Sequence, residues 1–392
     1  ASRGVQVMGI DKNKDAVALI NEGRVPIVEP DLDTLVLGAV GAGNLRAVTK
    51  PEPADAFIIA VPTPFTDDHK PDLSYLEAAA RELAPVLVPG NLVVLESTSP
   101  PGTTENLAQW LARDRADLSF PHQAGDQADI HLAHSPERVL PGHILRELVE
   151  NDRVIGGMTT ECAARAERLY GLFVNGQCYL TDSATAELVK LAENAYRDTN
   201  IAFANELATV CEKLDMDVWR VLELANHHPR VNILQPGPGV GGHCIAVDPW
   251  FIVDAAPDET PLIQTVRAIN DGRPAQLVEK VLAAAKDGSS TAIACLGLAY
   301  KADLDDLRQS PAIDAARLLA DEFKGELLVV EPNIQELPAE LAGRAGMELC
   351  DLDRALEQAE IIVLLTDHRE FRSLDCARLA GKIIFDSRGI WR

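Results

Sequence analysis

The segment from Gly237 to Trp250, GPGVGGHCIAVDPW, places a cysteine behind several glycines and prolines, with an acid four residues later. These glycines and prolines disfavour a helix or a central strand before Cys244 and predict a loop whose bare backbone can approach a ligand. A thiolate in such a loop can attack an electrophilic carbon of a substrate. We therefore predict that Cys244 is a nucleophile.

Three other interpretations compete for this segment. A free cysteine is often a buried hydrophobic residue, but Cys244 has glycine, histidine and an acid around it rather than a periodic apolar face. A zinc site of His243, Cys244 and Asp248 would need a second pair of Cys or His residues at short spacing, so no metal is predicted. A Gly-x-Gly-x-x-Gly spacing also occurs here, but no β-branched strand precedes it and we expect Pro249 to interrupt any following helix, which argues against a dinucleotide motif.

The composition limits the classes of partner. The chain has 392 residues, of which 47% are hydrophobic and 24% charged, and a formal net charge of -24. It has no apolar run near the ~18 residues of a membrane span, and so acidic a chain is a poor ligand for nucleic acid. Its seven cysteines are widely spaced without a Cys-x-x-Cys pair, which is typical of reduced thiols. We expect a cytoplasmic enzyme of two or three domains that binds neither membrane nor nucleic acid.

The start of the chain predicts a cofactor-binding strand. Residues 5–10, VQVMGI, end at Asp11, and an acid at this place in a βαβ unit binds the adenosine ribose and favours NAD over NADP. An acid after a strand can also be an ordinary turn residue. The phosphate-binding glycine turn is expected about 20 residues before the acid. We therefore expect that turn to lie before residue 1, and the chain as given to bind NAD more weakly than a longer one.

Three further apolar runs, FIIAV (57–61), NLVVLEST (91–98) and DIHLAHS (129–135), alternate with helical patterns. This order predicts an α/β fold with a doubly wound parallel sheet, which binds ligands at the carboxyl ends of its strands. The polar residues that follow these runs include Thr63, Thr98, Glu137 and Arg138. Each alone would suit an ordinary turn, but together they predict a binding site.

Residues 182–214 contain neither Gly nor Pro and begin with good N-cap residues, which predicts one long helix. A polar stripe along this helix could be a solvated face, or it could line a cleft, because the facing stripe is rich in Leu and Ala. In a cleft, a lysine can hold an oxyanion. The stripe consists of Lys190, Asn194, Arg197, Ile201 and Asn205.

The end of the chain predicts a second α/β lobe, with strands at 291–297, 326–331, 361–366 and 382–386. Lys301 and Arg308 follow the first of these strands and supply the positive charge that a diphosphate needs. Ser310-Pro311 predicts a helix start. The predicted domains are a Rossmann-like NAD-binding lobe at 1–181, a helical middle at 182–285 and a second Rossmann-like lobe at 286–392.

The order of these features resembles the UDP-glucose/GDP-mannose dehydrogenase family over nearly the whole chain. The runs PERVLPG, ENDRVIGG and ANHHPRVNILQPGPGVGGHCIAVDPWF are similar to those of members that act on UDP-N-acetyl-D-mannosamine. The resemblance implies a UDP-sugar substrate whose C6 alcohol is oxidised to a carboxylate, with two NAD molecules used in turn. An alcohol dehydrogenase stops at the aldehyde, whereas a thiolate gives a thiohemiacetal and then a thioester that water can cleave.

The resemblance also implies roles for single residues. Cys244 would be the nucleophile, Lys190 and Asn194 would hold the C6 oxygen and the oxyanions, Asp248 would order Lys190 or water, and Glu137 would assist hydrolysis. Thr98 would lie between cofactor and substrate. Arg230 would reach the site of a neighbouring subunit, which implies at least a homodimer built on the long helix. The residues that match substrate contacts are Arg138, Val139, Lys190, Asn194, Arg197, His228, Arg230, Gly241, Tyr300, Lys301 and Arg388, and those expected to contact NAD are Asp11, Thr63, Thr98 and Arg308.

Three alternatives to this function stay open at the level of sequence. Oxidation of UDP-N-acetylglucosamine differs only in the C2 configuration of the sugar. A non-catalytic nucleotide-sugar binding protein would not need the set Cys244, Lys190, Asn194 and Asp248. A thiol hydrolase using Cys244 with His243 would need two adjacent loop residues to point at each other and would leave both α/β lobes without a role.

Overall fold

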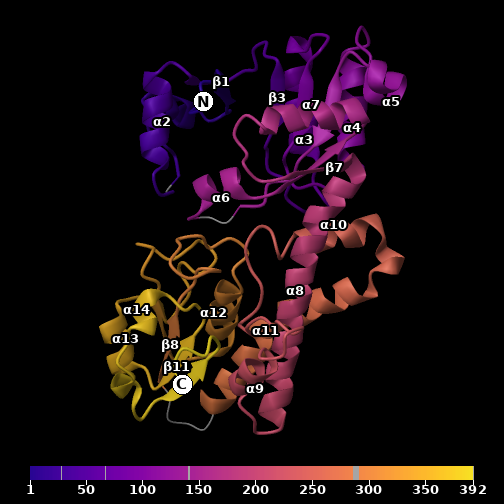
Figure 1. The fold of residues 1–392 in the computed structure, drawn as a ribbon. Helices are drawn as coiled ribbons and strands as arrows, with labels where there is room; N and C mark the ends of the chain where they lie inside the picture. The colour runs from indigo at the N-terminus through magenta and orange to yellow at the C-terminus, as the bar shows by residue number, and fades with distance from the viewer. Residues whose placement is uncertain (28, 67, 140–141, 286–290, 392) are drawn as a thin grey trace. The chain divides into compact units, whose positions relative to one another are not determined.

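The computed structural model describes residues 1–27, 29–66, 68–139, 142–285 and 291–391. The chain packs as two units, Ala1–Ala192 and Glu193–Arg392. The boundary lies inside helix α8, Ser183–Lys213, which begins in the first unit and ends in the second (Figure 1). The prediction of one long helix over 182–214 is confirmed.

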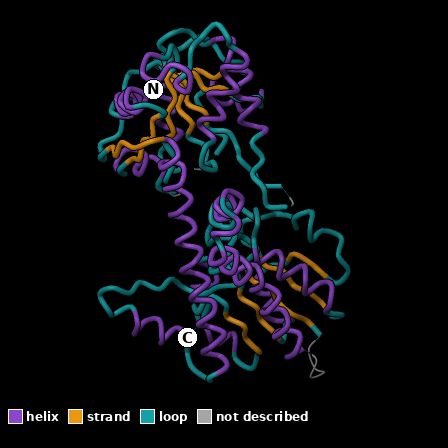
Figure 2. The backbone as a smooth tube through the Cα atoms, turned by 90° about the vertical axis from the view of Figure 1, so that its right-hand side faces the viewer, coloured by secondary structure: helices purple, strands orange, loops and turns teal. Residues whose placement is uncertain are grey.

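The first unit contains a five-stranded sheet and a separate pair of parallel strands. Strands β3, β4 and β5 are parallel, β6 is antiparallel to β5, and β7 is parallel to β6. Figure 2 shows the strands of the protein in orange. Strands β1 and β2 pair only with each other among the described residues. The strands are β1 Val7–Ile10, β2 Leu45–Val48, β3 Ala56–Ile59, β4 Leu92–Leu95, β5 His131–His134, β6 Arg153–Gly157 and β7 Cys178–Asp182. The helices before α8 are α1 Lys14–Asn21, α2 Leu32–Gly41, α3 Ser74–Leu83, α4 Thr103–Asp114, α5 Pro121–Ala124, α6 Ile144–Glu150 and α7 Thr160–Tyr170.

Two apolar cores cover the two faces of the five-stranded sheet. Helices α3 and α4 contribute Leu76 and Leu107 to a core that includes Leu132 of β5. Helix α7 contributes Ala166 to a core that includes the next residue of the same strand, Ala133. Because successive side chains of a strand point to opposite faces, buried runs of this kind are apolar at every position.

The second unit contains a five-stranded sheet that is parallel throughout, in the order β10-β9-β8-β11-β12. Helices α11 and α12 cover one face and α13 and α14 the other. The order corresponds to 3-2-1-4-5 of a doubly wound nucleotide-binding fold. The strands are β8 Ala292–Leu296, β9 Glu326–Val330, β10 Met347–Leu349, β11 Ile361–Leu364 and β12 Ile383–Asp386. The helices after α8 are α9 Val218–Ala225, α10 Asp248–Ala255, α11 Pro261–Ala285, α12 Pro311–Glu322, α13 Leu352–Gln358 and α14 Arg369–Arg372.

Helix α8 is fixed to the first unit by Glu187, which is almost fully buried. The Glu187 carboxylate accepts hydrogen bonds from the backbone N–H of Gly102 at 2.6 Å and of Thr104 at 2.7 Å, and from the Thr104 hydroxyl at 2.6 Å. These donors form the N-terminus of α4, where a negative charge is favourable. One carboxylate of α8 therefore caps a helix of the first unit.

In the second unit, α8 is fixed by a buried ion pair. Asp198 of α8 is fully buried and accepts hydrogen bonds from Arg267 and Asn270 of α11, both at 2.7 Å. Burial raises the pKa of Asp198 to about 6, although Arg267 and Asn270 act in the opposite direction. Arg267 also pairs with Asp271 one turn later in α11. The pair ties α8 to α11 at a place that water cannot reach.

The predicted strands are all present, most of them one to three residues shorter than their apolar runs. Strands β2, β6, β7 and β10 were not predicted, and β6 makes the first sheet mixed rather than parallel throughout. The expectation for Pro249 was wrong, because this proline occupies the first turn of α10, where its missing N–H costs no hydrogen bond. Ser310 caps α12 as predicted, with its side chain accepting from the N–H of Ala312. The division into three domains stays a prediction.

The first testable prediction concerns the buried ion pair. Arg267→Met should lower the free energy of unfolding by about 3 to 5 kcal/mol, because it leaves the Asp198 charge buried without its partner. The measurement is urea unfolding followed by the circular dichroism of the helices. The matched control is Arg220→Met, which breaks the exposed pair of Arg220 with Glu223 and should cost less than about 1 kcal/mol. Equal losses in the two variants would show that the buried pair does not stabilise the unit.

Candidate active site

The segment that leads to Cys244 is held by amide side chains of α8. Asn200 donates to the backbone oxygen of Asn232 and accepts from the N–H of Leu234, both at 2.9 Å. Asn205, which is fully buried, accepts from the N–H of Gly237 at 2.9 Å. A segment without regular structure needs such partners for its backbone groups. The Asn side chains of α8 therefore satisfy backbone groups of this segment, as a neighbouring strand would do in a sheet.

Cys244 itself lies in a turn that leads directly into α10. Its backbone oxygen accepts from the N–H groups of Val247 at 3.0 Å and Asp248 at 2.8 Å. Asp248 is the first residue of α10 and is almost fully buried, and the Asn194 side chain donates to its carboxylate at 2.6 Å. The structure thus brings Asn194 and Asp248 together, one turn of backbone away from the half-buried Cys244.

The cysteine loop, which comprises residues 237–247, packs against the turn that follows β8. A Cβ on Gly241 would lie 2.8 Å from the Cβ of Tyr300, and one on Gly242 would lie 2.8 Å from its ring. Gly242 also has a φ of +86°, which a larger residue would adopt only with strain. Its N–H donates to the backbone oxygen of Arg308 at 3.3 Å. Both glycines are required for the close approach of this loop to Tyr300.

Charges gather around the cysteine loop. Burial raises the pKa of Tyr300, and the nearby Asp306 and Cys244 raise it further. Arg308 is exposed and pairs with Asp306 through two hydrogen bonds, Nε to Oδ1 at 2.8 Å and Nη2 to Oδ2 at 2.6 Å. The pairing with Asp306 raises the pKa of Arg308, and Cys244 adds to the effect. Electrostatic interaction therefore links Cys244 with Tyr300 and Arg308 of the C-terminal lobe.

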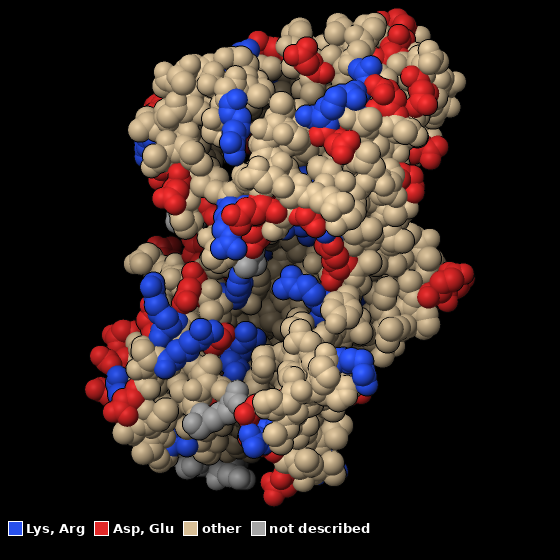
Figure 3. Space-filling model, in the orientation of Figure 1, with Lys and Arg blue, Asp and Glu red and all other residues tan. Residues whose placement is uncertain are grey.

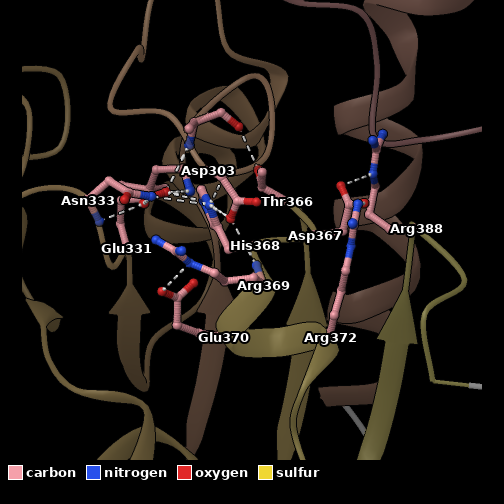
Figure 4. Close-up of polar contacts among 12 residues, drawn as sticks. Asp303, Glu331, Asn333, Thr366, Asp367, His368, Arg369, Glu370, Arg372 and Arg388 are labelled. Atoms are coloured by element: carbon pink, nitrogen blue, oxygen red, sulfur yellow. Dashed lines mark hydrogen bonds and ion pairs between the residues drawn. The ribbon is translucent and has the colours of Figure 1, made fainter. Parts of the chain in front are cut away.

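The carboxyl edge of the second sheet is closed by its own side chains (Figure 4). Glu331, after β9, accepts from the N–H groups of Leu298 at 2.7 Å and Ala299 at 3.0 Å, in the turn after β8. His368, after β11, interacts with the same carboxylate at 2.9 Å through Nε2, while its Nδ1 accepts from the N–H of Asp303. The contacts require a neutral imidazole with its proton on Nε2. One acid and one histidine thus fix the turn that carries Tyr300 and Lys301.

In the first unit, the carboxyl edge of the sheet brings two predicted cofactor residues together. The hydroxyl of Thr63 donates to the backbone oxygen of Thr98 at 2.6 Å. Asp11 follows β1, is exposed, and accepts from the N–H of Asn13 at 2.8 Å. An exposed carboxylate at the end of a parallel strand fits the hydroxyls of a ribose. The contacts of Asp11, Thr63 and Thr98 with NAD stay predictions.

Glu137 belongs to a charge cluster that the sequence did not reveal. Its carboxylate pairs with Arg153 at 3.2 Å, and it also accepts from the backbone N–H of Arg138 at 2.7 Å. Arg153 is almost fully buried, and its guanidinium stacks 4.8 Å above the ring of Tyr170. Tyr170 in turn donates to Glu96 at 2.6 Å, and burial raises the pKa of Glu96. Two acids thus share one buried arginine.

The register of β5 and β6 explains this pairing. Ala133 lies opposite Gly157, and His134 lies opposite Gly156. Continued beyond the strand ends, this antiparallel register places Glu137 opposite Arg153. Because β6 was not predicted, no feature of the sequence joined the two residues.

The other predicted site residues lie mainly at the surface. Lys190 is half-buried on α8 and precedes Asn194 by one turn. Val139 and Arg388 are half-buried, and Arg138 donates to the backbone oxygen of Asp152. The remaining residues are exposed, and they are Arg197, His228, Arg230 and Lys301. Their roles, like those of all the predicted site residues, stay predictions.

Several residues that organise the site were missed. Asp198 and Asn200 had a visible signal, since Asp-Thr-Asn is an unusually polar run inside an Ala- and Leu-rich helix. Arg153 had none, because its partner Glu137 lies 16 residues away in a different segment of the first unit. All seven cysteines are free thiols. None of the described helices is long and apolar enough to cross a membrane, and the described residues contain no cluster of three metal-binding side chains.

Two α/β sheets with polar residues at their carboxyl edges, together with a cysteine loop, define a nucleotide-dependent enzyme. The UDP-glucose/GDP-mannose dehydrogenase family matches the chain in three parts: its NAD binding domain at residues 1–174, its central domain at 184–272 and its UDP binding domain at 294–392. The chain belongs to this family and is a nucleotide-sugar dehydrogenase that uses NAD. The resemblance seen in the sequence is confirmed.

Individual relatives are similar over the whole chain. NDP-N-acetyl-D-galactosaminuronic acid dehydrogenase of Ralstonia nicotianae is 59% identical over 391 residues, which are 100% of this chain and 92% of that protein. UDP-N-acetyl-D-mannosamine dehydrogenase of Yersinia pestis is 55% identical over 400 residues, which are 100% of this chain and 95% of that protein. A solved structure, UDP-D-ManNAc dehydrogenase of Pyrococcus horikoshii, has a TM-score of 0.89 at 37% identity and covers 100% of this chain and 91% of its own.

The second testable prediction concerns His134, the last residue of β5. It is fully buried, neither ring nitrogen has a partner among the described residues, and burial lowers its pKa from 6.5 to about 3. Below pH 6.5 the unfolded chain binds a proton at this residue that the folded chain does not, so stability is lost as the pH falls toward 3. In His134→Gln the free energy of unfolding should therefore fall less steeply as the pH is lowered, by up to roughly 1.4 kcal/mol per pH unit.

The measurement is urea unfolding at several pH values between 5 and 7.5. His122→Gln, which replaces an exposed histidine of the same unit, should keep the wild-type slope. If His134→Gln also keeps it, His134 is not the source of the acid sensitivity.

Proposed function

We propose that this dehydrogenase oxidises the C6 alcohol of UDP-N-acetyl-D-mannosamine to the carboxylate, with Cys244 as a covalent nucleophile. The single observation that carries the proposal is the loop in which Cys244 lies, with the buried Asn194–Asp248 pair at its end and Tyr300 on its glycines. The mannosamine substrate is supported by relatives with that name at 54 to 57% identity.

The proposed chemistry assigns one task to each residue. Two NAD molecules, bound in turn, would each accept one hydride, the first from the C6 alcohol and the second from the thiohemiacetal, while the hydroxyl proton is released in each oxidation. Between these steps the Cys244 thiolate adds to the aldehyde carbon, which forms the C–S bond and an alkoxide that takes up a proton to become the thiohemiacetal hydroxyl. Lys190 and Asn194 stabilise the negative charge on the C6 oxygen. Glu137 then removes a proton from the water that attacks the thioester, which releases the carboxylate and the thiol.

The Asn194–Asp248 hydrogen bond suits the task of Asn194. The Asp248 carboxylate fixes one amide proton of Asn194 at 2.6 Å, so the other N–H has a defined direction. Donors fixed before the reaction stabilise developing charge better than donors that must first be oriented. Asp248 therefore acts through Asn194 as well as through any contact with Lys190 or water.

A second sugar is supported by relatives with a different name. The relative with 59% identity is named for an N-acetyl-D-galactosaminuronic acid. N-acetylated mannosamine and galactosamine differ from N-acetylglucosamine only in the configuration at C2 and at C4, respectively, so the same C6 chemistry applies to all three. Comparing kcat/KM for the three UDP-sugars decides among them.

We also propose that the enzyme is a homodimer formed through α8. Tyr196, Phe203 and Val210 recur every seven residues on this helix, with side chains 66%, 50% and 45% exposed. Apolar residues at this spacing form a stripe on one side of a helix, typical of a helix–helix contact. A second copy of the chain offers an identical stripe, and Arg230 would then reach the neighbouring site.

The third testable prediction concerns stoichiometry. The wild-type enzyme should form two NADH for each UDP-sugar consumed. The measurement is the absorbance of NADH after a limiting amount of UDP-sugar has reacted with excess NAD. Cys244→Ser should abolish this turnover and leave binding of the UDP-sugar within a few-fold, because the serine keeps the shape of the loop. Two NADH per sugar at a normal rate in this variant would rule out the covalent relay.

The fourth prediction concerns the dimer. Phe203→Glu should convert the dimer into monomers, because burying an unpaired charge in an apolar contact is costly. Light scattering after size exclusion gives the mass. Leu224→Glu changes an equally exposed apolar residue on α9, 52% exposed and outside the stripe, and should leave the mass unchanged. A dimer that survives Phe203→Glu must use another surface.

A further inference from the structure

Asp367 lies between two arginines at the carboxyl edge of the second sheet. It follows β11 by three residues, and Figure 4 shows Arg388 and Arg372 both reaching its carboxylate. Arg388 donates from Nε to Oδ1 at 3.0 Å, and Arg372 donates from Nη2 to Oδ2. The Asp367 side chain is only 11% exposed. Both carboxylate oxygens are thus engaged, each by a different arginine.

The charges of this triad do not cancel. Two guanidinium groups and one carboxylate leave one positive charge, in a chain whose formal net charge is -24. Burial alone would raise the pKa of Asp367, but Arg388 and Arg372 lower it below its ordinary range, so the carboxylate stays ionised. The triad itself therefore carries one net positive charge, and the ionised carboxylate stays bonded to both arginines. Figure 3 shows several Lys and Arg side chains close together on this unit, and both basic and acidic side chains on the first unit.

The other side of Arg388 lies against Gly237, the first glycine of the cysteine loop. A Cβ on Gly237 would be 2.7 Å from Nη1 of Arg388. Gly237 is itself fixed, because its N–H donates to Asn205 at 2.9 Å and its backbone oxygen accepts from Arg273 at 3.3 Å. The guanidinium therefore lies between the Asp367 carboxylate and the Cα of Gly237, and a side chain at residue 237 would displace it.

The remaining donors of Arg388 have a defined direction. Its Nε is used by Asp367, and no hydrogen bond joins Nη1 or Nη2 to another residue in the described parts of the chain. The paired N–H groups of a guanidinium match two oxygens of a phosphate. Arg388 is part of the region that matches the UDP binding domain.

We propose that Asp367 and Gly237 are positioning residues that hold Arg388 for the diphosphate of the sugar nucleotide. The inference rests on the proposed UDP-sugar substrate and on the contact of Arg388 with it that the family resemblance implies. It adds that the affinity for the diphosphate depends on two residues that do not touch it. Because Gly237 begins the cysteine loop, the same contact ties the bound diphosphate to the segment that carries Cys244.

The fifth prediction tests this with two variants that disturb Arg388 in different ways. Asp367→Asn removes the charge that holds the guanidinium, and Gly237→Ala pushes the guanidinium aside while every charge is kept. Calorimetry with UDP as the probe should show at least a tenfold higher Kd for Asp367→Asn and a several-fold higher Kd for Gly237→Ala. In both variants KM for the UDP-sugar should rise, while kcat and KM for NAD stay within twofold.

Matched controls exclude general damage to the lobe. Asp353→Asn breaks an exposed ion pair with Arg378 in the same lobe and should leave the Kd for UDP unchanged. Gly272→Ala adds a Cβ on α11 with no atom closer than 3.9 Å and should do the same. Adding Asp367→Asn to Arg388→Met should weaken UDP binding no further, because the residue to be positioned is already gone.

The outcomes separate the inference from the proposed function. If Arg388→Met weakens UDP binding but Asp367→Asn and Gly237→Ala do not, the positioning role is overturned while Arg388 remains a ligand. If Arg388→Met has no effect on UDP binding, both the positioning role and the assignment of Arg388 are overturned. The oxidation and its Cys244 relay stand or fall separately, on the NADH formed per sugar.

Discussion

The buried carboxylate of Asp198 is the constraint on which the second unit depends. A charge removed from water is tolerated only when other groups replace the water, and Arg267 and Asn270 do so from α11. Asn270 also accepts a hydrogen bond from Asn205, which binds the backbone of Gly237. A connected series of hydrogen bonds thus runs from Asp198 at the centre of α8, through Asn270 and Asn205, to Gly237 at the start of the cysteine loop, and it fixes that end of the loop.

The sequence was informative where the signal was local. Strands showed as apolar runs, α8 as a long stretch without Gly or Pro, and the cysteine loop as a cluster of glycines. Two of the glycines have a specific reason for their identity, since Tyr300 fills the space where the side chains of Gly241 and Gly242 would be. The question left open for the polar stripe of α8 is answered residue by residue: Asn194 and Asn205 are buried and bonded, whereas Arg197 is exposed.

The rest could not be predicted because it depends on contacts between distant segments. Glu137 meets Arg153 through the antiparallel strand β6, a short strand with two terminal glycines that lacks the pattern of a typical buried strand. Asp367 meets Arg388 across 21 residues, and Glu331 meets His368 across 37. In each case the two residue types are common in proteins, and only the strand order of the sheet to which they belong brings the two side chains together. Pro249 presents a different difficulty, because its signal is local but ambiguous: a proline can end one helix or occupy the first turn of the next.

The carboxylate of Glu331 makes the two α/β sheets chemically different despite their related architecture. In a dinucleotide-binding fold the N–H groups after the first strand bind pyrophosphate, and the acid after the second strand binds ribose. In the second sheet that acid instead binds those N–H groups, at Leu298 and Ala299, and His368 holds it there. A pyrophosphate at this turn would have to displace a carboxylate of its own sign. Inhibitors that mimic dinucleotides should therefore bind this lobe weakly. A compound selective for it needs an anionic group that can pair with the arginines of the lobe.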